Sequence, residues 1–198
     1  MPPFSILHVC MGNICRSPMA ERLLVVAARD LVGDKADELL LVHSTGTGRW
    51  HVGDRMDPSA ARQVRARGGD PDTFRARQLA AEHIEASDLI LTATGEQYEF
   101  VLGLDPAAAD RTFVLGQFGR LLPRVDLSAL PAAAPTPDSV YARGVALVSA
   151  AAAVRGGQEP LVGDDLDDPW GRGHAYFGRV ADEIEETVRP LAAALLGV

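Results

Sequence analysis

Short apolar runs alternate along the chain with longer stretches in which apolar residues recur at helical spacing. The runs are bounded by polar or turn residues and predict β-strands at residues 5–9, 39–43, 88–93 and 112–115. The longer stretches predict helices at residues 18–31, 57–67, 96–102, 116–122, 139–154 and 176–196. Strands that alternate with helices form βαβ units, so the pattern predicts an α/β fold of three layers, with helices on both faces of a four-stranded parallel sheet. Such sheets bind ligands at the carboxyl ends of their strands.

The length of 198 residues predicts a single domain with a substantial core, spanning residues 1–198. The composition changes between residues 126 and 164. The stretch 130–137, Leu-Pro-Ala-Ala-Ala-Pro-Thr-Pro, is typical of an irregular connection, and an alanine-rich helix is expected after it. We therefore expect residues 126–164 to be a variable, partly irregular segment of that domain.

Charge and cysteine content exclude several classes of function. The chain has 19 basic and 27 acidic residues, a net charge of −8, which argues against nucleic acid or an anionic membrane as a partner. It has no apolar run of about 18 residues, and its first residues do not resemble a signal peptide. Two cysteines form no disulfide framework, so we expect a reducing compartment, the cytoplasm. The five histidines have no metal-ligand spacing, so neither a metal site nor a cofactor is expected.

The stretch after the first predicted strand carries the most chemistry. Residues 10–17 read Cys-Met-Gly-Asn-Ile-Cys-Arg-Ser, and helical spacing begins at Pro18. Ser17 is predicted to cap that helix, and Gly12 and Asn13 suit a turn with unusual dihedral angles. A loop between a strand and a helix points its backbone N–H groups and the positive helix end at one place. That arrangement suits a phosphate group.

Within this loop, Cys10 and Arg16 suit complementary roles. The helix end and the arginine stabilise a thiolate at Cys10, which is a nucleophile. Arg16 can fold back over the loop and bind two phosphate oxygens at once. The alternative interpretation is that the two cysteines are packed small residues or a metal pair. The phosphate-binding loop is predicted to contain, besides Cys10 and Arg16, the residues Met11, Gly12, Asn13, Ile14, Cys15 and Ser17.

Residues 9–21, Val-Cys-Met-Gly-Asn-Ile-Cys-Arg-Ser-Pro-Met-Ala-Glu, resemble the N-terminal signature of the low-molecular-weight protein tyrosine phosphatases. The resemblance continues through most of the chain and is weakest in the segment 126–164. It implies that Cys10 attacks the phosphoester, that Arg16 binds the phosphate and that Ser17 helps to keep the cysteine ionised. It also implies that Asn13 holds the loop in shape and that Cys15 forms a reversible disulfide with the nucleophile under peroxide.

Cleavage of a phosphomonoester by a thiolate requires an acid that protonates the leaving oxygen. The resemblance points to the late Asp-Pro motif of the family, which matches Asp-Pro-Trp-Gly at residues 168–171. Asp168 is therefore predicted as the general acid, with Asp167 as the alternative. Asp164 and Asp165 belong to the same acidic run, whose members are expected to be mostly solvated loop charges. Repulsion between such neighbours favours a protonated acid.

Two tryptophans are predicted to form the walls of the substrate pocket. Trp50 follows the second strand at the family's variable aromatic position, and Trp170 lies beside the predicted acid. Two aromatic faces would enclose a phenyl ring and favour phosphotyrosine. Ile14 favours the same substrate, because the related arginine phosphatases carry Thr at that position. Ser44 matches a family serine that hydrogen-bonds the loop asparagine.

Two positions depart from the family pattern. Phe74 stands where family members usually have a histidine braced against the loop asparagine, so Asn13 needs another partner. Thr94 stands where many relatives have an aspartate. Neither change affects the nucleophile, the arginine or the acid, so both bear on rate and specificity.

The resemblance implies a protein tyrosine phosphatase, a cysteine-dependent phosphomonoester hydrolase that works through a cysteinyl-phosphate. Its expected partner is a phosphotyrosine-containing protein, and a tyrosine kinase as a further partner is left open. The thioredoxin-coupled arsenate reductases share this fold and loop, but they relay a disulfide through later cysteines, and none follows Cys15. A second alternative is a phosphate-binding module without catalysis, which retention of Cys10, Arg16 and Asp168 together argues against.

Overall fold

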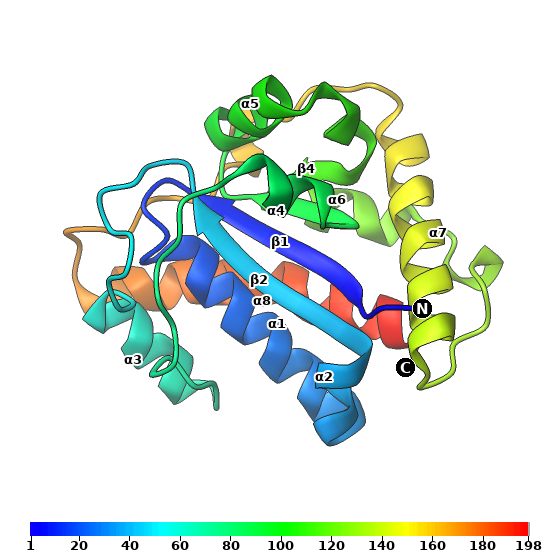
Figure 1. Cartoon of the computed structure of the whole chain (residues 1–198), viewed down its shortest axis with the longest axis horizontal. Coiled ribbons are helices and arrows are strands. Elements are labelled where there is room, and N and C mark those ends of the chain that lie inside the picture. Colours follow the sequence, from blue (N-terminus) through cyan, green and yellow to red (C-terminus); the bar gives the residue numbers. More distant parts are fainter. Residues whose placement is uncertain (198) are drawn as a thin grey trace.

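The computed structural model describes residues 1–197 and confirms the predicted α/β architecture (Figure 1). The strands are β1 (Phe4–Cys10), β2 (Leu40–Gly46), β3 (Leu89–Thr92) and β4 (Thr112–Val114). They form one parallel sheet in the order β2-β1-β3-β4. Because β1 lies inside the sheet, the loop that follows it emerges at the centre of the carboxyl edge, where a parallel sheet binds its ligands.

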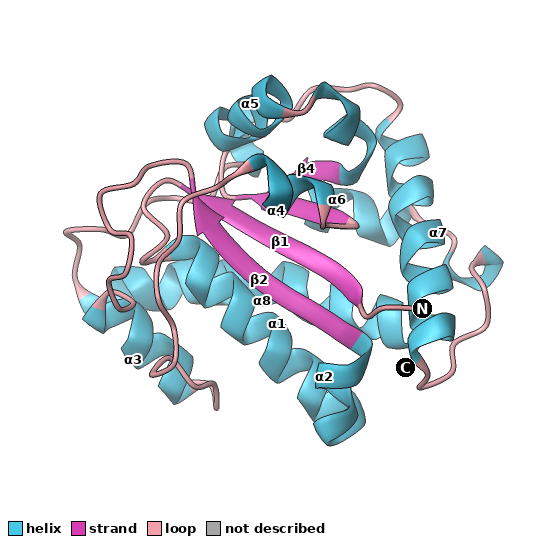
Figure 2. Ribbon diagram, in the orientation of Figure 1, coloured by secondary structure: helices cyan, strands magenta, loops and turns pink. Residues whose placement is uncertain are grey.

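Helices cover the sheet and form the outer layers, as Figure 2 shows. They are α1 (Arg16–Val32), α2 (Ala36–Leu39), α3 (Pro58–Ala66), α4 (Ala81–Glu85), α5 (Gly95–Leu104), α6 (Leu115–Leu121), α7 (Pro137–Arg155) and α8 (His174–Leu196), with short 3-10 helices that include η2 (Pro106–Arg111) and η5 (Val162–Asp164). None of the helices described between residues 1 and 197 is long and apolar enough to cross a membrane.

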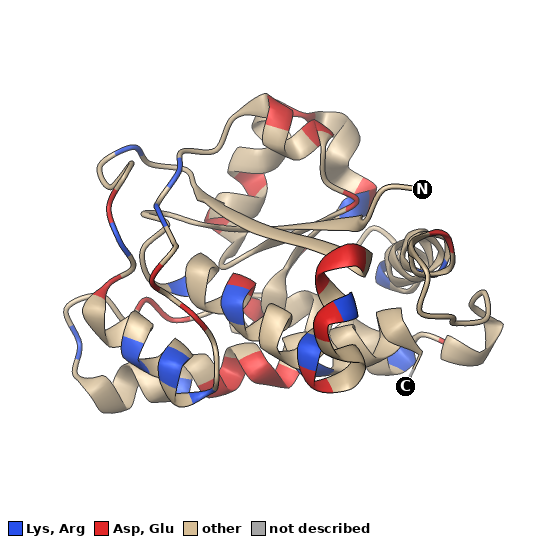
Figure 3. Ribbon diagram, turned by 60° about the horizontal axis from the view of Figure 1, so that its bottom comes forward, with Lys and Arg blue, Asp and Glu red and all other residues tan. Residues whose placement is uncertain are grey.

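The side chains of the strands pack into two separate hydrophobic cores, which explains why the strands are apolar runs in the sequence. Alternate side chains of β1, such as Ile6, pack with α1, α6, α7 and α8 in a large core. The intervening ones, Leu7 and Val9, pack with α4, α5 and η2 around Ile84 and Val101 in a smaller core. Both faces of the sheet are therefore buried, and Figure 3 shows no charged residue on a strand.

The segment 126–164 is more ordered than its composition suggests. It contains the long helix α7, which extends the predicted helix at both ends. The side chain of Thr136 caps α7 by accepting a hydrogen bond from the Ser139 N–H. The irregular parts are mainly residues 130–136 and 156–161.

Candidate active site

The loop between β1 and α1 is held in place by main-chain hydrogen bonds from the segment after β2. Three loop carbonyl oxygens accept backbone N–H groups: Cys10 from Thr47 at 3.0 Å, Met11 from Gly48 at 2.9 Å and Ile14 from Asp57 at 2.9 Å. In a trans peptide the C=O and the following N–H point in opposite directions. The N–H groups of residues 11, 12 and 15 therefore point away from these anchors, toward the interior of the loop, where they can donate to an anion.

The two residues predicted to need unusual dihedral angles behave differently. Asn13 has a φ of 56° and, within residues 1–197, is the only non-glycine residue with a positive φ. Asparagine tolerates this left-handed conformation better than most residues. The prediction was wrong for Gly12, whose φ is not in that region. A Cβ at Gly12 would lie 3.2 Å from Cδ2 of His51, so the His51 ring would have to shift by a few tenths of an ångström to admit one.

The prediction that Ser17 caps the helix was also wrong. Helix α1 begins at Arg16, with Cys15 at the N-cap position and no side-chain cap. The Ser17 hydroxyl accepts a hydrogen bond from Asn13 Nδ2 at 2.9 Å and lies 2.9 Å from Cys10 Sγ. Because it is engaged with the loop, it cannot also cap the helix. Pro18 fits as the third helical residue, since first-turn N–H groups have no acceptor within the helix.

Cys10 lies buried at the base of this loop. Its Sγ accepts the backbone N–H of Asn13 at 3.3 Å, and the Ser17 hydroxyl is its second neighbour. The loop therefore places one backbone donor and one hydroxyl group against this sulfur.

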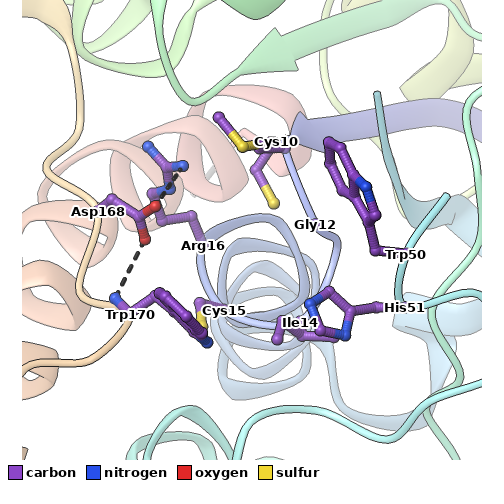
Figure 4. A pocket seen from close by; sticks show the side chains of 10 residues that line it. Cys10, Gly12, Ile14, Cys15, Arg16, Trp50, His51, Asp168 and Trp170 are labelled. Atoms are coloured by element: carbon purple, nitrogen blue, oxygen red, sulfur yellow. Dashed lines mark hydrogen bonds and ion pairs between the residues drawn. The ribbon is translucent and has the colours of Figure 1, made fainter. Parts of the chain in front are cut away.

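Arg16 and Asp168 meet beside the loop, although they are far apart in the sequence (Figure 4). Nη2 of the buried Arg16 lies 3.3 Å from Oδ2 of Asp168, and Nη1 donates to the Leu166 carbonyl at 3.1 Å. The other oxygen of Asp168 accepts the Trp170 N–H at 3.1 Å. The arginine and the predicted acid therefore lie at one site before any substrate is bound.

Loop and walls enclose a cavity of 190 Å³ that is lined by Cys10, Met11, Gly12, Ile14, Cys15, Arg16, Trp50, His51, Asp168 and Trp170. The two tryptophans lie on opposite sides of this pocket in Figure 4. Trp50 is 71% exposed and Trp170 is 64% exposed, so neither is a core residue. Their position leaves aromatic faces available to a ligand.

The profile of the family "Low molecular weight phosphotyrosine protein phosphatase" matches residues 5–127. The chain belongs to this family. It is 44% identical over 89 residues to "Low molecular weight protein-tyrosine phosphatase A" of Mycobacterium tuberculosis (strain CDC 1551 / Oshkosh), a match that covers 45% of this chain and 52% of that relative. The chain thus spans about half the length of that curated relative.

Solved structures of other proteins share the fold over nearly the whole chain. A protein tyrosine phosphatase from Entamoeba histolytica superposes with a TM-score of 0.67 at 20% identity and covers 95% of this chain and 94% of that one. The arginine phosphatase YwlE from Geobacillus stearothermophilus superposes with a TM-score of 0.64 at 26% identity, covering 96% and 91% of the two chains. The fold is therefore common to phosphatases named for different phosphorylated residues.

In the acidic run, Asp165, Asp167 and Asp168 are exposed, as expected for solvated loop charges, whereas Asp164 is not. Asp164 is buried and binds the Arg120 guanidinium through both oxygens, at 3.0 and 2.9 Å. Burial favours a raised pKa for Asp164, but the hydrogen bonds from Arg120 and from the Leu161 N–H outweigh it and lower the pKa. Asp165 accepts the Gly95 N–H at 2.7 Å.

Asp167, the alternative acid, is directed to a different set of partners. It accepts hydrogen bonds from Arg179 and from the Tyr176 hydroxyl, both at 2.9 Å, and it does not line the pocket. The bond from Arg179, followed by that from Tyr176, lowers the pKa of Asp167. Asp164 and Asp167 therefore each have an arginine partner, from α6 and α8 respectively, and a lowered pKa, the opposite of what mutual repulsion alone would give.

Cys15 is buried and lines the pocket together with Cys10. Burial, followed by the negative charges of Asp57 and Cys10, raises the pKa of Cys15. Its sulfur is therefore a protonated thiol at neutral pH. Both cysteines are free.

The departure at Phe74 is compensated by the main chain. Phe74 is buried in the large core, and the backbone N–H of Arg77 donates to Asn13 Oδ1 at 2.8 Å. The expected hydrogen bond between Asn13 and Ser44 is present at 2.9 Å. At the second departure, Thr94 pairs with Gln97 at the start of α5 and does not line the pocket.

Sequence reasoning missed two residues of this site. His51 lines the pocket and its Nδ1 lies 2.9 Å from Asp54 Oδ2, and its place beside Trp50 was the only signal. Glu21 is buried beneath the loop, where its Oε2 accepts the Ser44 hydroxyl at 2.6 Å. Burial raises the pKa of Glu21, opposed by the Ser44 hydrogen bond and by the charges of Arg22 and Arg77.

A cluster of three His, Cys, Asp or Glu residues able to hold a metal is absent from residues 1–197.

Proposed function

We propose that this chain hydrolyses phosphomonoesters through a cysteinyl-phosphate intermediate, as a protein tyrosine phosphatase. The observation that carries the proposal is the pocket itself, in which Cys10, Arg16 and Asp168 are the reactive groups. Loop N–H groups and the Arg16 guanidinium would bind the three non-bridging phosphate oxygens.

In the first step, the Cys10 sulfur attacks phosphorus, and the bond from phosphorus to the leaving oxygen breaks. Asp168 gives its proton to that oxygen, so that an alcohol departs instead of an alkoxide. In the second step, Asp168 takes a proton from a water molecule that attacks the cysteinyl-phosphate, which releases phosphate and restores the thiolate. The pairing of Asp167 with Arg179 and Tyr176 supports Asp168 as the acid, because an acid must face the pocket.

The substrate that best fits the walls is a phosphorylated tyrosine in a protein. Trp50 and Trp170 are exposed aromatic faces on opposite sides of the pocket, which suits a phenyl ring. Ile14 adds an apolar surface within the same pocket. The mycobacterial relative is named as a tyrosine phosphatase, and the Geobacillus neighbour as an arginine phosphatase. We favour the aromatic substrate because of these three side chains.

Two further elements belong to this proposal. Cys15, a protonated thiol in the same pocket as the nucleophile, is suited to trap oxidised Cys10 as a disulfide. Two free cysteines suit a reducing compartment such as the cytoplasm.

The decisive experiment compares the wild type with Cys10→Ser on an aryl phosphate, on a phosphotyrosine peptide and on a phosphoarginine peptide. We expect hydrolysis of the first two by the wild type only, with phosphate still bound by the variant in calorimetry. Turnover that survives in Cys10→Ser would exclude the covalent mechanism. Faster cleavage of the phosphoarginine peptide would contradict the substrate assignment, and arsenate reduction coupled to thioredoxin would support the reductase instead.

A further inference from the structure

A second cavity, of 230 Å³, lies between α1 and the segment that joins α3 to α4, which runs beside α1 in Figure 1. Its lining is mostly polar and consists of Glu21, Arg22, Thr73, Phe74, Arg75 and Arg77. It shares no residue with the pocket that contains Cys10. A ligand in this cavity would therefore bind outside the candidate active site.

The cavity concentrates positive charge in an acidic protein. Three guanidiniums and one carboxylate line it, so two positive charges are in excess when Glu21 is ionised, whereas the whole chain has a net charge of −8. One oxygen of Glu21 accepts the Ser44 hydroxyl at 2.6 Å, and the other lies 3.2 Å from Nε of Arg22. Within residues 1–197 the other two arginines of the cavity have no carboxylate partner. Such a local excess of positive charge attracts anions.

Two of the guanidiniums are held by main-chain carbonyls at one edge only. Nη2 of Arg77 donates to the Ser44 carbonyl at 3.1 Å. Nη1 of Arg75 donates to the carbonyls of Asp72 and Phe74, at 3.1 and 2.6 Å. The remaining nitrogens of both side chains have no acceptor among residues 1–197. Because a guanidinium carries five N–H donors, both arginines keep donors for a ligand.

The third guanidinium, that of Arg22, includes a buried donor without an acceptor. Its Nε is close to Glu21, but it has no hydrogen-bond partner within the part of the chain from residue 1 to 197. Its Cζ lies 6.0 Å from the centre of the Phe74 ring, which also lines the cavity. A buried N–H without an acceptor is costly, and an anion in the cavity would bring acceptors to this side chain.

A tetrahedral oxyanion fits this set of donors. Each guanidinium offers paired N–H groups that match two oxygens of a phosphate. One arginine is enough for the two oxygens of a carboxylate, whereas several arginines suit an anion with more oxygens and a second charge. We propose that this cavity is a second anion site that binds a phosphate group, either free or carried by another molecule. Such a site goes beyond the hydrolysis proposed at Cys10 and does not depend on it.

Equilibrium dialysis against radiolabelled inorganic phosphate, at pH 7.5 and constant ionic strength, counts the ions that each protein binds. The wild type should bind two phosphates, one in each cavity, and Arg75→Gln should bind one. Arg16→Ala removes the guanidinium of the catalytic pocket and should also bind one. A single phosphate that Arg16→Ala loses and Arg75→Gln keeps would overturn the proposal. A single phosphate with the opposite dependence would support the second site and count against the catalytic pocket instead.

Arg124→Gln is the matched control for the loss of one positive charge. Arg124 is an exposed arginine of η3 (Leu122–Arg124) and does not line the cavity, so this variant should still bind two phosphates. Arg22→Gln removes a different guanidinium of the cavity and keeps the test decisive if Arg75→Gln fails to fold. In the Arg16→Ala background it should weaken phosphate binding by about fivefold or more. Equal affinities with Arg22→Gln and with Arg124→Gln would refute a site built from these arginines.

Competition in the Arg16→Ala protein identifies the class of anion and its source. Sulfate should displace the labelled phosphate, and acetate at the same concentration should not. Equal displacement by acetate would contradict a site for a tetrahedral anion. A phosphoserine peptide that displaces phosphate at lower concentration than unlabelled phosphate does would assign the site to a phosphate group carried by a protein. A peptide that displaces it only at higher concentration would assign the site to the free anion.

Discussion

Replacement of His8 by phenylalanine should make the protein markedly less sensitive to acid. His8 lies on β1, is 1% exposed, and its Nε2 has no hydrogen-bond partner among the residues from 1 to 197. Burial, followed by the charge of His43, lowers the pKa of His8 to about 3. The folded protein therefore holds His8 neutral at pH values where the unfolded chain protonates it.

The magnitude follows from the two pKa values. The pKa of His8 is 6.5 in the unfolded chain and about 3 in the folded protein, so the unfolded state binds more protons between these values. Stability therefore falls as the pH drops below 6.5, and at pH 5 the loss is about 2 kcal/mol. Burial, followed by the charges of Arg77 and His83, lowers the pKa of His43 to about 4, and His43 adds a loss of about 2 kcal/mol at pH 5 by the same calculation.

The assay is urea unfolding of wild type and His8→Phe at pH 7.5 and pH 5. The variant keeps His43 and every carboxylate. The difference in unfolding free energy between the two proteins therefore changes with pH because of His8. We expect this difference to grow by about 2 kcal/mol at pH 5, which corresponds to roughly 4–8 °C in Tm. His8→Gln also removes the titrating group but buries an amide, so it should show the same flattened pH dependence with a lower stability than His8→Phe at pH 7.5. An equal difference between wild type and His8→Phe at both pH values would refute the reasoning.

Three further outcomes concern the pocket. Asp168→Asn should slow hydrolysis of phosphoesters with poor leaving groups at least tenfold more than that of activated ones, and the same pattern in Asp167→Asn instead would reassign the acid. After peroxide treatment, thiol reductant should restore the wild type but not Cys15→Ser, and equal recovery would leave Cys15 as a packing residue. Gly48→Ala should displace Trp50, since a Cβ would lie 1.8 Å from the indole, and so raise KM for aryl phosphates several-fold with little effect on kcat. Unchanged KM would contradict the wall role of Trp50.

The fold could be predicted well because the apolar runs of its strands are uninterrupted and the apolar periodicity of its main helices is long. Strands buried on both faces are continuous apolar runs, and α1 and α8 repeat their apolar positions over several turns. The predicted strand and helix bounds differ from the observed ones by three residues or fewer. Helices α2 and α4, with four and five residues, were missed because one turn carries no periodic signal.

The part of the site that is contiguous in the sequence could be predicted, whereas the part that depends on tertiary contacts could not. The loop from Cys10 to Ser17 is contiguous, so its chemistry could be read directly from the sequence. The partners of the acidic run could not, because Arg120 and Arg179 reach it from helices that precede and follow it. Sequence alone gave each aspartate the same surroundings, whereas the fold gives each a different one.

Phe74 replaces the family histidine that would hydrogen-bond Asn13. The effect of this lost side-chain hydrogen bond cannot be judged from the side chains alone, because the main chain supplies another donor. The end of β2 pairs with residues 77–79. The Gly46 N–H donates to the Arg77 carbonyl at 2.9 Å, and the Leu79 N–H donates to the Gly46 carbonyl at 2.7 Å. This pairing directs the Arg77 N–H at Asn13, and any residue at position 77 except proline would offer the same donor. A histidine brace would change its hydrogen bonding as it titrates near neutral pH, whereas a peptide N–H does not titrate. The left-handed turn at Asn13 is therefore supported by a main-chain donor whose strength is independent of pH over the range in which the thiolate must form.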